Sequence, residues 1–222
     1  MDLLDRVHPV ARPLLEKVDA TLVAGGAPAG HPIWPLLRRL GALPGEAVAQ
    51  LATVAPGGLT PVGDALHQHA DAYRHRVDEV PMPAGWRGPA ADAYAASWSA
   101  LAAHLAGSAP DTLAGRLADT AGYLDDVAAW LTRARRAVAG TVAECLGSAE
   151  AVTVHSGPGD PGPSPNAVTT AAATIGAHLL ATAVEVLDDG RALHERWVGR
   201  LDELSYRPPA PAPTTSGHLR LG

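Results

Sequence analysis

The sequence predicts an all-α protein, an antiparallel helical bundle built around a helix–turn–helix hairpin. Apolar residues recur at steps of three and four along most of the chain, which is the period of an amphipathic helix. About one residue in five is alanine, the strongest helix former, well above ordinary usage. Phenylalanine is absent and isoleucine occurs only at Ile33 and Ile175, so residues that favour strands are scarce.

Composition also excludes several functional classes. The chain has 222 residues and a net charge of -6. Without a long basic run, it does not provide the concentrated positive surface of a nucleic-acid-binding protein. Its single cysteine, Cys145, has no partner within the chain for a disulfide.

Residues 1–57 are expected to form short helices. Apolar residues from Leu3 to Leu22 fit one helical face, and Pro9 and Pro13 should kink or delay that helix. Two short helical segments are expected at 33–40 and 46–54, separated by glycine and proline.

Residues 58–147 are expected to form a hairpin followed by a long helix. Thr60 can cap the first helix, which should run to Val80, and a second proline-initiated helix should start at Pro89 and end at Gly107. The third helix has a sustained period of 3.5, typical of a bundle seam. We expect the packing or partner-binding seam to comprise Tyr94, Trp98, Leu101, Leu105, Leu113, Leu117, Leu124, Val127, Leu131 and Val138.

The rest of the chain is expected to contain one more long helix. Residues 148–165 are rich in proline and glycine and predict a loop, mobile from Ser156 onward. Asn166 should then cap a helix that extends to residue 206 and packs on the bundle. Residues 207–222 have the composition of a disordered tail.

The turn between the two hairpin helices carries a recognisable motif, Trp86-Arg87-Gly88. A tryptophan at this place can plug the end of a bundle, and Gly88 permits an unusual backbone angle before Pro89. With its flanking helices, the motif resembles the Trp-x-Gly (WXG) family of helical-hairpin proteins exported by type VII (ESX) secretion. The resemblance covers residues 60–147, and Trp86 and Gly88 are the positions that match the motif.

The resemblance implies a non-catalytic protein that acts as a secretion substrate, pairing partner or adaptor. Its expected partner is another helical hairpin or a second copy of the chain. Alternatively, the last helix of the same chain is a candidate to occupy the groove that a partner hairpin fills in the family's dimers. The family's Tyr-x-x-x-Asp/Glu export signal is absent: the tyrosines at 73, 94, 123 and 206 are followed at that spacing by Val77, Trp98, Val127 and Ala210. Alanine-rich, lysine-poor composition is typical of a GC-rich genome such as that of an actinobacterium.

The start of the sequence does not have the basic-then-apolar layout of a Sec signal peptide. We therefore expect the protein to be cytoplasmic at synthesis, and the resemblance implies a non-Sec type VII route for any secretion. The uncharged stretch 161–184 is only weakly apolar, so a membrane span is not expected.

Other residues are candidates for a metal-binding or reactive site. The acidic and histidine residues along 64–78 share a helix face, and a solvated surface is the favoured interpretation over a metal site. His69, on the apolar stripe of the same helix, is expected to be partly buried. Cys145 lies on the seam, where an inert buried thiol is expected.

The three arginines Arg133, Arg135 and Arg136 suggest helix-surface charge. They also carry the alternative function, a structural bundle that contacts a membrane surface or anionic lipid. No catalytic motif, cofactor-binding loop or closed metal-ligand set is apparent, so we expect neither an enzyme nor a cofactor.

Overall fold

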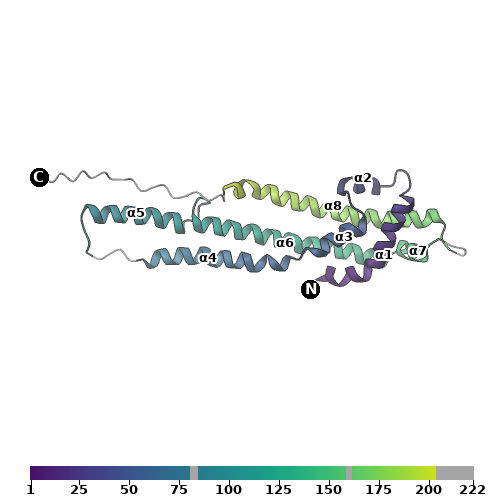
Figure 1. Ribbon diagram of the computed structural model, residues 1–222, viewed down its shortest axis with the longest axis horizontal. Helices are drawn as coiled ribbons and strands as arrows, with labels where there is room; N and C mark the ends of the chain where they lie inside the picture. The colour runs from purple at the N-terminus through teal and green to yellow at the C-terminus, as the bar shows by residue number, and fades with distance from the viewer. Residues whose placement is uncertain (81–84, 159–161, 204–222) are drawn as a thin grey trace. The chain divides into compact units, whose positions relative to one another are not determined.

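The computed structural model describes residues 1–80, 85–158 and 162–203 (Figure 1). Their regular structure is helical, with no strand among the described residues, which confirms the all-α prediction. The longer helices are α1 (Leu3–Gly25), α4 (Thr60–Glu79), α5 (Pro89–Ala106), α6 (Leu113–Leu146) and α8 (Pro165–Glu203). The shorter ones are α2 (Ile33–Leu40), α3 (Pro44–Thr53), a 3-10 turn (Pro56–Gly58) and α7 (Ala149–Ser156).

The chain divides into two compact units. Unit 1 comprises Met1–Gly58 and Asp126–Glu195, and unit 2 comprises Leu59–Asp125 and Arg196–Gly222. The long helices α6 and α8 therefore contribute to both units, and the segment expected at 58–147 is shared between them.

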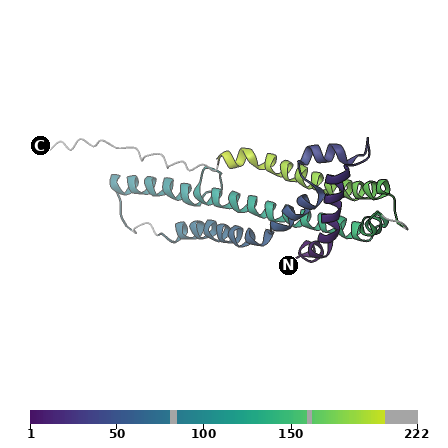
Figure 2. The same ribbon diagram turned by 45° about the vertical axis from the view of Figure 1, so that its right-hand side comes forward.

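In unit 1, α6 and α8 run antiparallel. The indole Nε1 of Trp130 donates a hydrogen bond to the carbonyl oxygen of Val186 at 3.1 Å, and the hydroxyls of Thr141 and Thr182 are 2.9 Å apart. Residue number thus rises along α6 as it falls along α8. Figures 1 and 2 show α1 crossing these two helices at a steep angle.

The core of unit 1 lies between these helices. It is formed by apolar side chains from α1, α2, α3, α6, α7 and α8, with alanines between the larger residues. Representative fully buried members are Leu4, Leu14, Val18, Ile33, Val142, Ile175 and Leu180. The small residues allow the helices to approach closely: a Cβ on Gly176 would lie 2.7 Å from Ile33 and 2.9 Å from Pro44.

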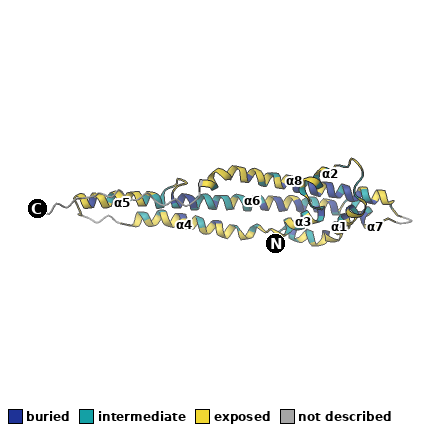
Figure 3. Cartoon of the chain, turned by 45° about the horizontal axis from the view of Figure 1, so that its top comes forward, coloured by how far each residue is buried: buried dark blue, intermediate teal, exposed yellow. Residues whose placement is uncertain are grey.

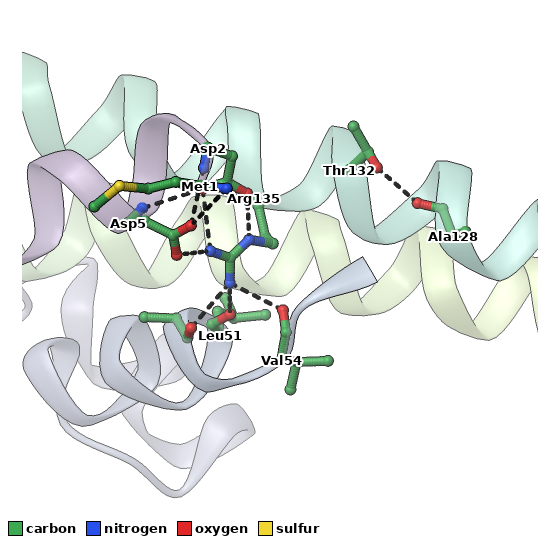
Figure 4. A network of polar contacts seen from close by, with 9 residues as sticks. Met1, Asp2, Asp5, Leu51, Val54, Ala128, Thr132 and Arg135 are labelled. Atoms are coloured by element: carbon green, nitrogen blue, oxygen red, sulfur yellow. Dashed lines mark hydrogen bonds and ion pairs between the residues drawn. The ribbon is translucent and has the colours of Figure 1, made fainter. Parts of the chain in front are cut away.

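Arg135 lies inside unit 1 (Figure 4), which corrects the prediction that it belongs to a surface cluster with Arg133 and Arg136. Its side chain is 2% exposed. It pairs with the carboxylates of Asp2 and Asp5 and donates hydrogen bonds to the carbonyl oxygens of Leu51, Ala52 and Val54. Arg133 and Arg136 remain exposed.

Several local predictions about unit 1 were wrong. The segment 148–165 is not all loop, because residues 149–156 form α7, capped by the Ser148 side chain at Ala151 N. Of the two effects expected from Pro9 and Pro13, a kink or a delayed start, the delay does not occur, because α1 begins at Leu3. Ser164 rather than Asn166 binds the first turn of α8, through Ala167 N. The loop residues 159–161 and the predicted tail, 207–222, lie outside the described residues.

In unit 2, the first turns of α4 pack against α6, where Gly63 lies against Asp125. The end of α8 packs against α6 through aromatic contacts. The ring of Trp197 meets that of Tyr123 edge-on at 5.7 Å, and Arg200 lies over Trp197 at 5.2 Å.

A candidate protein-interaction face

The hairpin helices α4 and α5 bury very little apolar surface. Their buried residues are Gly63 and Ala70 on α4 and Ala91 on α5, all of them small. Figure 3 shows both helices largely exposed. The exposed large apolar residues of this hairpin are Val62, Tyr73, Val80, Trp86, Tyr94 and Leu101, which we call the hairpin face.

The residues of the hairpin face lie on one side of the hairpin. Successive residues of an α-helix are rotated by about 100°. On α4, Val62 and Tyr73 are therefore displaced by about a quarter turn, in the same rotational direction, from the buried line through Gly63 and Ala70. On α5, Leu101 is displaced in the same rotational direction from the line through Ala91, Trp98 and Leu105.

The chain reverses direction between the two helices, which contact each other in unit 2 (Figure 1). In an antiparallel pair, equal displacements in the same rotational direction point to the same side. The apolar residues of both helices thus form a single two-helix surface.

The turn contributes an aromatic pair to this surface. Gly88, the N-cap of α5, has φ 105°, a conformation that glycine adopts without strain, and Pro89 follows in the first turn. The ring of Trp86 lies 5.5 Å from that of Tyr94. Trp86 nevertheless remains 47% exposed, so it is not buried as a plug at the hairpin end.

The predicted seam is buried unevenly. Leu131 and Val138 are in the buried interior, whereas Tyr94 and Leu101 are exposed. The intermediate members are Trp98, Leu105, Leu113, Leu117, Leu124 and Val127. The seam therefore has a closed part on the second half of α6 and an open part on α5 and the start of α6.

The described end of α8 in unit 2, residues 196–203, contacts another side of α6. Its contacts on α6 include Asp119, Gly122 and Tyr123. By the 100° step, these residues lie on the opposite side of α6 from Leu113 and Leu117. Among the described residues, the open part of the seam therefore lies beside the hairpin face.

Basic residues border the hairpin face on α4. A hollow of 290 Å³ is lined by His69, Ala72, Tyr73 and Arg76. His69 is exposed, which corrects the expectation of partial burial, because none of the described helices packs over this side of α4. Arg76 was not singled out from the sequence, although its spacing of seven residues from His69 places it on the same stripe.

The residues of the other candidate sites are exposed, paired with other side chains or buried. The acidic and histidine residues along 64–78 are exposed as predicted, and His67 pairs with Asp125 at 3.1 Å. Within the described residues, no three His, Cys, Asp or Glu side chains are placed to hold a metal ion. Asp188 on α8 pairs with Arg39 on α2, and both side chains are about half exposed. Burial raises the pKa of the Cys145 thiol to about 11, which is unfavourable for a nucleophile.

Helix α8 is long and apolar enough to cross a membrane, with a mean hydropathy of 1.5 in its most apolar window. However, 61% of that window is buried inside the protein. The window thus resembles the core helix of a water-exposed bundle more than a lipid-facing span.

In comparisons with known proteins, no family model, curated protein or solved structure matches this sequence.

Proposed function

We propose that this chain is a non-catalytic helical interaction protein that binds a helical partner through the hairpin face. The observation that carries this proposal is the row of exposed large apolar residues shared by α4 and α5. Apolar and aromatic residues that lie contiguously on a surface are typical of protein–protein interfaces. Binding would remove these residues from water.

The geometry fits a helical occupant. Two antiparallel helices form a shallow groove between their apolar stripes, and an amphipathic helix presents a matching stripe at i, i+3, i+4 and i+7. Trp86 and Tyr94 supply aromatic side chains of the kind that contribute most to such interfaces, and Leu101 adds apolar area beside them.

We further propose that the partnership belongs to type VII secretion. The support is the resemblance of the Trp86-Arg87-Gly88 turn and its flanking helices to the WXG family. In that setting the chain would be a substrate, a pairing partner or an adaptor. Because the usual tyrosine-based export signal is absent, a partner that carries one would have to supply it.

The interaction is tested by substituting one residue of the face. Tagged wild-type chain and Leu101→Ala are purified from a host with an active type VII system, together with the helical-hairpin protein encoded nearest to it. The proposal expects this protein to co-purify with the wild type and to be depleted with Leu101→Ala. Leu187→Ala, which truncates a similarly exposed leucine in unit 1, should retain it.

Equal retention by Leu101→Ala and Leu187→Ala would reject the hairpin face as the binding surface. The secretion link has its own readout. If the chain stays in the cytoplasm of a strain that exports other type VII substrates, and binds none of them, the link to secretion fails.

A second candidate function is a structural bundle that contacts anionic lipid. Arg133 and Arg136, both exposed on α6, favour it. Flotation with vesicles of anionic lipid tests it: binding that survives Arg133→Gln with Arg136→Gln excludes this arginine pair as the lipid contact.

A further inference from the structure

The aspartates of α4 lie on the side away from the hairpin face. On α4, Asp64, Asp71 and Asp78 recur every seven residues and are exposed. By the 100° step they lie about a quarter turn from the buried line, on the side away from Val62 and Tyr73. On the side of the hairpin face, the ionisable residues of α4 are His69 and Arg76.

Helix α5 repeats this arrangement. His104 lies on the side of Tyr94 and Leu101, whereas Asp92 lies on the other side. The described part of the hairpin face therefore has basic residues at its borders and no carboxylate, although the whole chain has a net charge of -6.

The hollow on α4 provides a position where a carboxylate of the partner could bind. Arg76 and His69 line it together with the ring of Tyr73. Arginine presents several N–H donors in a fixed fork that fits a carboxylate. A carboxylate seated beside Tyr73 would satisfy these donors at the edge of the apolar contact.

We infer that the occupant of the hairpin face is an amphipathic helix from a different protein, with carboxylates flanking its apolar stripe. This inference rests on the proposed function and identifies the chemistry of the partner. A second copy fits poorly, because a symmetric dimer through this face would bring Arg76, His69 and His104 of both copies together without a carboxylate. Like charges at an interface disfavour that pairing.

Two synthetic helical peptides test the charge preference. They share one leucine stripe, but all flanking positions are glutamate in one peptide and lysine in the other. Anisotropy of a fluorescent label on each peptide is measured against the full chain. We expect the glutamate peptide to bind roughly tenfold more tightly at low ionic strength, with the difference shrinking as added salt screens the charges.

A matched pair of variants locates the effect. Arg76→Gln removes a positive charge from the hairpin face, and Gln68→Glu adds a negative charge on the other side of α4. Both variants lower the net charge by one and keep good helix formers. We expect Arg76→Gln to weaken binding of the glutamate peptide about threefold or more, and Gln68→Glu to leave it unchanged.

The outcomes separate this inference from the proposed function. Equal binding of both peptides, lost in Leu101→Ala, overturns the charge preference and supports a helix-binding face. If neither peptide binds, both the inference and the helix-binding function fail. Light scattering that shows a wild-type dimer, dispersed by Leu101→Ala, would make a second copy the occupant and overturn the inference.

Discussion

The guanidinium group of Arg135 and the carboxylate of Asp2 form a two-point ion pair. The Nε atom lies 2.5 Å from one carboxylate oxygen and an Nη atom 3.1 Å from the other. Asp2 also caps α1, because its side chain accepts a hydrogen bond from Asp5 N. The same guanidinium group donates hydrogen bonds to three carbonyl oxygens at the end of α3. One α6 side chain thus fixes the start of α1 and the end of α3.

Replacing Arg135 should destabilise unit 1. Arg135→Gln removes the guanidinium group that pairs with Asp2 and Asp5 and that donates hydrogen bonds to the α3 carbonyls. We expect a loss of about 3 kcal/mol in unfolding free energy, the low end for breaking a buried ion pair, since both carboxylates are partly exposed. Denaturant unfolding followed by circular dichroism measures it.

The neighbouring residue provides the control. Arg136 is exposed, so Arg136→Gln should change the unfolding free energy by less than about 0.5 kcal/mol. Equal effects of the two substitutions would contradict the structural role assigned to Arg135.

The same ion pair predicts a loss of stability in acid. Hydrogen bonding to Arg135 lowers the pKa of Asp2 from 3.8 to about 2. Because the folded-state pKa is depressed, the stabilisation is present above pH 3.8 and is lost as the pH falls from 3.8 towards 2. Melting temperatures across this range should fall less steeply for Asp2→Asn than for the wild type. Parallel curves would exclude Asp2 as a source of the acid sensitivity.

The helices could be predicted because their signals are local. The apolar period of α6 and α8 and the proline-initiated start of α5 are readable without knowing what packs on each helix. Helix α7 also had a local signal, Ser148 with Glu150 in the first turn, which the proline- and glycine-rich composition of the neighbouring segment outweighed.

Burial could not be predicted in the same way. Arg135 looks like its exposed neighbours in the sequence, and its partners Asp2 and Asp5 are more than 100 residues away. The seam reads as one continuous stripe, yet Leu131 is buried and Leu101 is 41% exposed. Periodicity identifies which residues share a face, whereas the packing of other helices decides which part of that face is open.

Asp19 should have the opposite pH dependence from Asp2. Its carboxylate accepts a hydrogen bond from Gly45 N at 2.9 Å, but burial and the nearby Glu46 raise its pKa above 3.8. A raised folded-state pKa means that the stabilisation is fully present below pH 3.8 and is lost as the pH rises through the folded-state value.

Asp19→Asn keeps an oxygen acceptor for Gly45 N and removes the desolvated charge. We therefore expect its melting temperature to exceed that of the wild type at pH 7, with the advantage disappearing below pH 3.8. A variant less stable than the wild type at pH 7 would show that the charge–amide hydrogen bond outweighs the cost of burying the carboxylate.

Replacing glycine with alanine should have opposite effects on stability at two positions within the long helices. In Gly176→Ala the new methyl group would meet Ile33 and Pro44 at less than 3.0 Å, and neither can move away because both are fully buried. We expect a loss of about 1–3 kcal/mol from overpacking. Gly140 has no heavy atom within 4 Å of an added Cβ, so Gly140→Ala should gain about 0.5–1 kcal/mol from helix propensity. Denaturant unfolding of the two variants measures the contrast; a gain in both would show that α8 does not approach α2 and α3 as closely as the Gly176 contacts require.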